Sequence, residues 1–258
     1  MNFFELHRQT KPLLMANVWD ALSVQAAETA GYDALGTSSA AIAAMYGYED
    51  GEGISFTELK HLITRLQAVS RLPLSVDLEA GYSESPERVV ENIIDLSSLG
   101  IVGINIEDSI VQNGNRTLVD MYFFGSKIQS IREGLKENNI SIFINVRTDT
   151  FLLKCKNALA ETINRGKYYA NHGADGLFVP CIVNEDDITM VIKEVCLPLN
   201  VMCMPDLPSF NTLSDLGVKR ISMGNFVHEK SQYYLKDILL KIHLKQSFDV
   251  VFNHENNG

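Results

Sequence analysis

The sequence has few of the features that mark nucleic-acid, membrane or secreted proteins. Lysine and arginine form no run, and the net charge is −10 at pH 7, so a basic face for a phosphate backbone is not expected. No apolar run approaches the ~20 residues that a membrane-spanning helix needs, and the first residues do not resemble a signal peptide. We therefore expect no nucleic-acid partner, no membrane and a cytoplasmic location.

Cysteine is also scarce, and no two cysteines are spaced as C-x-x-C. The four thiols (Cys155, Cys181, Cys196 and Cys203) are expected to be reduced rather than paired or bound to zinc. No G-x-G-x-x-G follows a predicted strand, which disfavours a dinucleotide-binding fold. What the chain does have is 46% apolar residues over 258 positions, enough for one domain covering 1–258.

Short apolar, strand-like runs alternate along the chain with helical segments, and about eight such units can be counted. A glycine ends a helix just before a strand at Gly31, Gly100, Gly173 and Gly217. This alternation predicts a parallel sheet. Eight units in this length favour a closed (β/α)8 TIM barrel, with an open doubly wound sheet as the alternative.

The last predicted helix, from about Lys230 to Lys245, carries an apolar stripe. Such a stripe packs either on the helix's own barrel or on another subunit, and periodicity does not separate the two. After this helix, the segment from Asn253 to Gly258 is expected to fray.

The stretch from Leu74 to Tyr82 carries the clearest chemical pattern. An apolar strand there ends in Asp77, and Glu79 follows two positions later. Residues two apart in a strand point to the same side, and two carboxylates there repel each other unless a cation lies between them. The alternative is that Asp77 caps the next helix and Glu79 belongs to a solvated loop.

Polar side chains recur where other predicted strands end, among them Ser38 and Ser39, Glu107 and Arg147. Strand ends form the active-site rim of an α/β barrel, and the spacing of strands places Asp77, Glu107 and Arg147 within roughly 10 Å of one another. The donors are oxygens only, which favours Mg²⁺, or Mn²⁺, over Zn²⁺. Because Mg²⁺ takes few carboxylates directly, Asp77 is expected to bind the ion and Glu79, Glu107 and Asp50 to hold its waters.

In this order, the strand-end motifs resemble those of the phosphoenolpyruvate mutase/isocitrate lyase superfamily. The likeness covers nearly the whole chain, and its parts are Asn17-Val-Trp19-Asp-Ala21, Gly36-Thr-Ser38-Ser39, Asp50, Asp77-Leu-Glu79-Ala-Gly-Tyr82, Asn105-Ile-Glu107-Asp108 and Asn145-Val-Arg147-Thr-Asp149.

The resemblance implies a barrel whose last helix swaps onto a neighbouring subunit in a homo-oligomer, a tetramer or a dimer. It implies Mg²⁺ at Asp77, with Asp50, Glu79 and Glu107 around it. It also implies a small keto- or hydroxy-acid substrate bound by the metal, by Ser38 and Ser39, and by Arg147. The shared reaction makes or breaks a C–C or P–C bond beside an oxyanion or enolate.

Departures from the family pattern select among its branches. The isocitrate-cleaving lyases carry a Lys-Lys/Arg-Cys-Gly-His loop after strand four, and the segment from Ser109 to Thr117 has no cysteine, histidine or lysine. In the mutase-like Lys-Thr-Asn loop, Asn115 matches the asparagine, but Asn113 replaces the lysine. Pro180 stands where the mutase has a histidine. The oxaloacetate-cleaving branch therefore becomes the favoured assignment.

We accordingly expect a Mg²⁺-dependent enzyme that cleaves a C–C bond of a small 2-oxo or 2-hydroxy carboxylate through a metal-stabilised enolate. The expected catalytic residues are Arg147, Asn115 and Asp50, with Trp19 as an additional substrate contact beside Ser38 and Ser39. The segment from Ser109 to Val119 is either a gate over the site or a mobile surface loop. The alternatives are a P–C bond enzyme, such as a phosphoenolpyruvate mutase or phosphonopyruvate hydrolase, and a barrel that binds a small acid without turnover.

Overall fold

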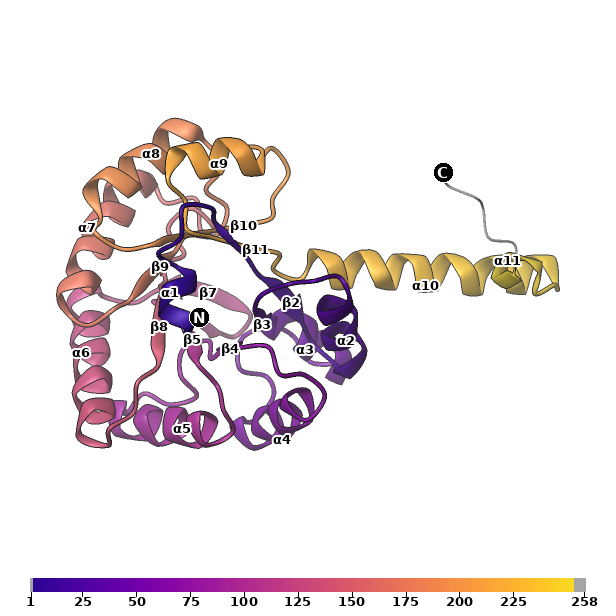
Figure 1. The fold of residues 1–258 in the computed structure, drawn as a ribbon, viewed down its shortest axis with the longest axis horizontal. Helices are drawn as coiled ribbons and strands as arrows, with labels where there is room; N and C mark the ends of the chain where they lie inside the picture. The colour runs from indigo at the N-terminus through magenta and orange to yellow at the C-terminus, as the bar shows by residue number, and fades with distance from the viewer. Residues whose placement is uncertain (1, 253–258) are drawn as a thin grey trace.

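A computed structural model of the chain describes residues 2–252 and contains a parallel sheet that closes into a barrel (Figure 1). Strand neighbours follow the order β1-β11-β10-β9-β8-β5-β4-β3-β2. The strands are β1 (Leu13–Leu14), β2 (Ala16–Val18), β3 (Leu35–Thr37), β4 (Leu74–Asp77), β5 (Gly103–Glu107), β8 (Phe143–Arg147), β9 (Gly176–Phe178), β10 (Leu199–Met202) and β11 (Arg220–Ser222).

The barrel closes through its first strand, which is divided at Met15. β1 pairs with β11, and β2 pairs with β3. Two short strands meet here because the chain changes pairing partner at Met15. Since β1 and β2 are consecutive, the nine strands occupy the eight positions of a TIM barrel, and the open-sheet alternative is wrong.

A ring of helices surrounds the sheet (Figure 1). They are α2 (Ala21–Thr29), α3 (Ser39–Tyr46), α4 (Phe56–Gln67), α5 (Pro86–Ser98), α6 (Met121–Glu137), α7 (Ala158–Asn171), α8 (Glu185–Glu194) and α9 (Phe210–Leu216). A capping box begins α4, because Ser55 accepts from the Glu58 N–H and Glu58 accepts from the Ser55 N–H. Ser85 caps α5 before Pro86.

Alternation along the strands separates the core from the site. In β5, Ile104 and Ile106 are fully buried among apolar side chains of the surrounding core, while Asn105 and Glu107 belong to polar networks inside the barrel. The same alternation in β8 buries Val146 and leaves Arg147 at the rim. The period of two thus carries polar side chains inward at the ends of β5 and β8.

A short helix, α1 (Phe3–Leu6), packs against the barrel near the start of β8 (Figure 1). The ring of Phe3 lies edge-on to Phe143, with centroids 5.7 Å apart, and the His7 ring stacks on Phe143 at 4.1 Å. A larger residue at position 103 would crowd α1, because a Cβ on Gly103 would lie 2.6 Å from the Phe3 ring. The fold therefore places its chemistry at the other end of the strands.

The segment after β5 is a hairpin rather than the loop we expected. β6 (Ser109–Gln112) pairs antiparallel with β7 (Asn115–Leu118). Asn113 and Gly114 between them have φ of 52° and 74°. Positive φ at both central residues is the geometry of a type I′ turn, for which Asn-Gly is the preferred sequence. The dipeptide was therefore a hairpin signal in the sequence.

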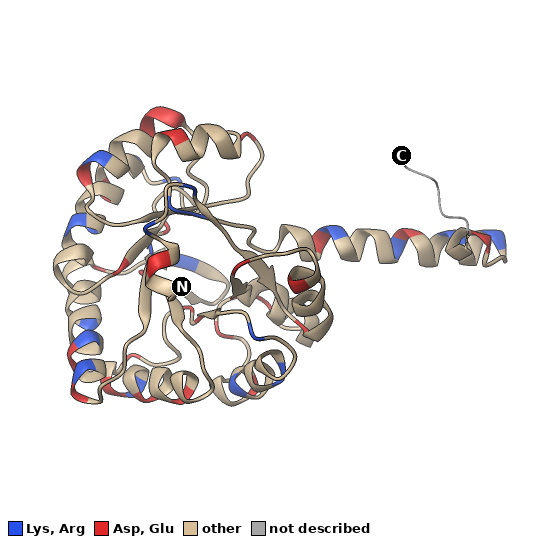
Figure 2. Cartoon of the chain, viewed as in Figure 1, with Lys and Arg blue, Asp and Glu red and all other residues tan. Residues whose placement is uncertain are grey.

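Helix α10 (Phe226–Lys245) leaves the barrel and projects away from it, with the short α11 (Asp249–Phe252) near its far end (Figure 1). Its apolar side chains are largely exposed, including Tyr234, Leu235, Ile238, Leu239 and Leu244. Charged residues of both signs lie along it (Figure 2). Within residues 2–252, no helix is long and apolar enough to cross a membrane. The segment expected to fray, Asn253 to Gly258, lies outside the described residues.

Candidate active site

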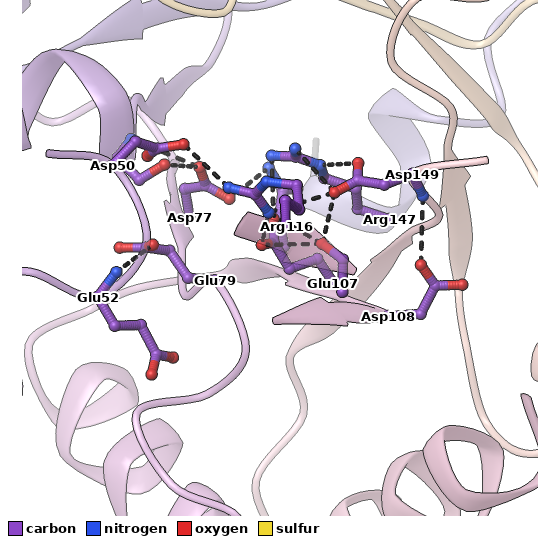
Figure 3. Close-up of polar contacts among 12 residues, drawn as sticks. Asp50, Glu52, Asp77, Glu79, Glu107, Asp108, Arg116, Arg147 and Asp149 are labelled. Atoms are coloured by element: carbon purple, nitrogen blue, oxygen red, sulfur yellow. Dashed lines mark hydrogen bonds and ion pairs between the residues drawn. The ribbon is translucent and has the colours of Figure 1, made fainter. Parts of the chain in front are cut away.

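One cavity of about 300 Å³ at the carboxyl ends of the strands is lined by both Asp77 and Arg147. Ser38 and Ser39, which we expected to bind substrate, and Asp50, which we expected near the metal, line the same cavity. Glu107 ends the strand between those of Asp77 and Arg147, and its Oε2 lies 3.0 Å from the Arg147 Nη1. The fold thus brings Glu107 and Arg147 together at neighbouring strand ends, and Asp77 lines the cavity beside them (Figure 3).

Asp77 is held in place by α3, β3 and β5. The Ser39 hydroxyl donates to Asp77 Oδ2 at 2.7 Å, and the Asn105 side-chain amide donates to Oδ1 at 3.4 Å. The Asp77 N–H donates to the Thr37 hydroxyl at 2.8 Å. Ser39 therefore orients Asp77, in addition to lining the cavity, and the weakly engaged Oδ1 keeps lone pairs for a further partner.

Glu79 lies beside Asp77 but points its carboxylate toward the loop of Glu52 (Figure 3). Its oxygens accept from the Glu52 N–H at 2.6 Å and from the Tyr82 hydroxyl at 3.1 Å. Burial, and then the like charges of Asp77, Asp50 and Glu107, raise the pKa of Glu79 to about 8. The raised pKa means that Glu79 tends to hold a proton at neutral pH, which limits the negative charge beside Asp77.

Arg147 is fixed by two acids. Its Nε and Nη2 donate to the carboxylate of Asp149 at 2.6 and 3.1 Å, and its Nη1 pairs with Glu107. The side chain of Asp149 is fully buried. A two-pronged pair of this kind sets the plane of the guanidinium, so Arg147 presents the rest of its donors to the cavity in one orientation.

Arg116, on the hairpin strand β7, is the site residue that sequence reasoning missed. Its guanidinium pairs with Asp50 at 3.0 Å, with Asp149 at 3.2 Å and with Glu107, and it lines the cavity (Figure 3). Burial raises the pKa of Glu107, and Arg147 and Arg116 oppose this rise. One side chain thus ties the hairpin to three acids on separate elements of the barrel rim.

The neighbouring Asn115, predicted to be catalytic, does not reach these residues. It is exposed, and its side-chain amide donates to the Asn113 carbonyl within the hairpin, at 3.4 Å. Trp19 is not among the residues that line the cavity, and its ring packs edge-on against the buried His228, with centroids 5.0 Å apart. The structure therefore places neither residue in the cavity.

A second cavity, of about 440 Å³, is lined by Glu79 and Glu107 together with apolar residues of the hairpin and of α6, such as Val111 and Phe124. It is the larger of the two, but neither Asp77 nor Arg147 lines it. The smaller cavity is the stronger candidate for chemistry, because it alone combines an open carboxylate with a fixed guanidinium.

The donor set fits a hard divalent cation bound mainly by one carboxylate. Five acids gather here (Asp50, Asp77, Glu79, Glu107 and Asp149) against two arginines. Within the described residues, no three His, Cys, Asp or Glu side chains converge as a metal cage. Mg²⁺ takes one or two carboxylates directly and keeps its waters. Asp77 offers the open oxygen, whereas Glu79 and Glu107 already hold partners.

A family model described as phosphoenolpyruvate phosphomutase matches residues 3–243. An uncharacterized protein of Mycobacterium tuberculosis is 33% identical over 233 residues, covering 90% of this chain and 85% of its own. Oxaloacetate decarboxylase 1 of Pseudomonas fluorescens is 27% identical, covering 84% and 75%. A solved structure titled "putative phosphonomutase" from Burkholderia cenocepacia superposes with a TM-score of 0.86 at 35% identity, covering 92% and 97%.

Proposed function

Because the chain belongs to the phosphoenolpyruvate phosphomutase family, within the wider mutase/isocitrate lyase superfamily, we propose that it is a Mg²⁺-dependent carbon–carbon lyase. Its substrate is a small 2-oxo or 2-hydroxy carboxylate of the oxaloacetate type. The observation that carries this proposal is the single cavity that holds the open Asp77 carboxylate and the fixed Arg147 guanidinium. Mn²⁺ is the alternative ion.

The residues of the cavity divide the work of binding. Arg147, locked by Asp149 and Glu107, receives a substrate carboxylate in a two-pronged contact. Ser38 and Ser39, at the start of α3, line the part of the cavity next to Asp77. Mg²⁺, when held at Asp77, would supply positive charge where the substrate's oxygens become more negative. Together these groups favour a reaction that develops an oxyanion.

The relatives support this choice of reaction. The curated relatives named for their activity include oxaloacetate decarboxylases at 26–28% identity. A P–C bond reaction on phosphonopyruvate or phosphoenolpyruvate is the second candidate, and the 35% identical protein titled as a phosphonomutase favours it. The four free thiols and the absence of a spanning helix among the described residues are consistent with the cytoplasmic location that we propose for this enzyme.

The assay that separates these activities measures pyruvate. Purified protein with Mg²⁺ is expected to release pyruvate from oxaloacetate faster than Mg²⁺ alone does, and the rate should fall to that background with EDTA. Pyruvate or phosphoenolpyruvate formed from phosphonopyruvate instead would select the P–C candidate, by hydrolysis or by isomerisation respectively. No product from either compound, together with Mg²⁺-dependent binding of oxalate, would favour a binding barrel without turnover.

We expect Arg116→Gln to lower kcat/KM for the substrate by about 10- to 100-fold, because the hairpin loses the charge that ties it to Asp50, Glu107 and Asp149. Thr117→Ala, an exposed change on the same strand, is the control and should leave kcat/KM within about twofold. Asn115→Ala tests the sequence-based prediction directly. A larger loss in that variant than in Arg116→Gln would restore Asn115 as the catalytic residue of the hairpin.

We also propose that α10 packs on a second copy of this chain in a homo-oligomer. A helix with Leu235, Ile238 and Leu239 exposed to water gains stability by burying them. The native protein is therefore expected to be a dimer or tetramer by light scattering, and Leu239→Glu to shift it toward monomer. Lys236→Glu, a charge change on the same helix, should keep the oligomer. A monomeric native protein would contradict this assignment.

A further inference from the structure

A row of asparagine side chains crosses the inside of the barrel beside Asp77. Asn105, Asn145 and Asn200 come from β5, β8 and β10 and are all buried. The amide of Asn145 donates both to Asn105 Oδ1 at 2.9 Å and to Asn200 Oδ1 at 3.1 Å. The row passes β9 because that strand contributes Gly176, where a Cβ would lie 2.7 Å from Asn145 Oδ1.

At both ends of this row, the neighbouring group decides which amide atom donates and which accepts. The Asn200 amide donates to the Val201 carbonyl at 2.7 Å, and a carbonyl can only accept. At the other end, Arg220 Nη2 donates to Asn105 at 3.3 Å. Because a guanidinium can only donate, the atom of Asn105 that faces Arg220 must be the oxygen. The NH₂ of Asn105 is therefore directed to Asp77 Oδ1, 3.4 Å away.

Arg220 is an unusual residue to find at this depth. It is 2% exposed, its Nε and Nη1 have no hydrogen-bond partner, and it forms no ion pair with any residue between 2 and 252. Burying a cation without a paired anion is costly. Burial lowers the pKa of Arg220 to about 9, and the charge of Asp77 opposes that change. An unpaired buried arginine does not stabilise the fold. The nearby charge of the Asp77 carboxylate offers a reason for its presence.

We propose that Arg220 is a positioning residue of the metal site, acting through Asn105 on Asp77. The inference rests on the proposed Mg²⁺ site and adds residues from the barrel interior to it. Arg220 and Asn145 both donate to Asn105 Oδ1 and so hold the Asn105 amide in one orientation, with Arg220 supplying the charged donor. That amide then donates to Asp77 Oδ1. Outer partners of this kind typically change metal affinity by about 10- to 100-fold when they are removed.

The test measures Mn²⁺ binding to the full-length protein by titration calorimetry, with Mn²⁺ electron paramagnetic resonance as the second readout. Arg220→Met is expected to weaken binding by about 10- to 100-fold, and Arg220→Lys, which keeps the charge and one donor, to restore part of that loss. Ser75→Ala is the control. Its Oγ lies buried in β4 without a hydrogen-bond partner, so the affinity should not change.

A double-variant cycle tests whether Arg220 acts through Asn105. If it does, Arg220→Met combined with Asn105→Ser weakens Mn²⁺ binding no more than Asn105→Ser alone. Should Arg220→Met fail to fold, Arg220→Lys takes its place in the cycle. Additive losses, or native affinity in a folded Arg220→Met protein, would overturn the inference and leave the Mg²⁺ site standing. A native protein that binds no Mn²⁺ would instead overturn the metal site itself, and the inference with it.

Discussion

Asp77→Ala is expected to abolish turnover and to weaken Mg²⁺ binding by more than about 100-fold. The change removes the carboxylate at the end of β4 that we propose as the direct ligand, so its effect should exceed the 10- to 100-fold loss typical of outer partners. Glu79 and Glu107 are poorly placed to replace it, because Glu79 is engaged by Glu52 and Tyr82, and Glu107 by two arginines. Calorimetry with Mg²⁺ and the pyruvate assay measure the two effects.

Two variants separate loss of the metal from loss of the fold. Asp77→Asn keeps the shape and an acceptor for the Ser39 hydroxyl, and it should be as inactive as Asp77→Ala while melting close to the native protein. Asp95→Ala removes a half-buried acid on α5, outside the cavity lining, that pairs with Lys60 at 2.8 Å, and should change neither binding nor turnover. Native Mg²⁺ affinity in Asp77→Ala would refute its role as the direct ligand.

Arg147→Lys is expected to lower kcat/KM by roughly 100-fold, mainly through a higher KM. Lysine is a single point charge and cannot reproduce a two-pronged contact to a carboxylate. It would also lose the paired bonds to Asp149 that set the direction of the native side chain, at 2.6 and 3.1 Å. Steady-state kinetics with oxaloacetate provide the measurement.

The matched control for this variant is Arg132→Lys. Arg132 on α6 also combines an acid, Asp175, with the Gly173 carbonyl, at 2.7 Å from its Nη2, but it lies outside the cavity. It should lose some stability and keep its kcat/KM. If both variants had unchanged kinetics, Arg147 would not be the substrate arginine, and the carboxylate of the substrate would have to bind elsewhere.

The part of the site that lies on strands was predictable because a strand has a simple period. Asp77, Glu107 and Arg147 each end a parallel strand, so their common rim followed from the alternation of strands and helices. Ser39 also lay where the sequence suggested, although its hydroxyl holds Asp77. For these residues, the local strand pattern and the order of strands in the barrel both predict a place at the same rim.

The site residues that the sequence did not reveal are those whose contacts cross from one part of the barrel to another. Asn115 and Arg116 are neighbours in a hairpin strand, so they point to opposite faces, and only the turn type decides which one meets the rim. The sequence contained that turn in its Asn-Gly pair, but we had expected a loop. The role of Arg220 likewise becomes visible only when β5 and β11 are placed across the same barrel.

The division of the first strand at Met15 has a consequence for how the protein is made. β1 can complete its hydrogen bonds only with β11, which is synthesised some 200 residues later. Until Arg220 to Ser222 leave the ribosome, the nascent sheet keeps two bare edges that invite pairing with other chains. Arg220, which we propose to position the metal site, therefore lies in the strand that closes the barrel. The buried charge and the last strand pairing of the barrel form in the same late step of folding.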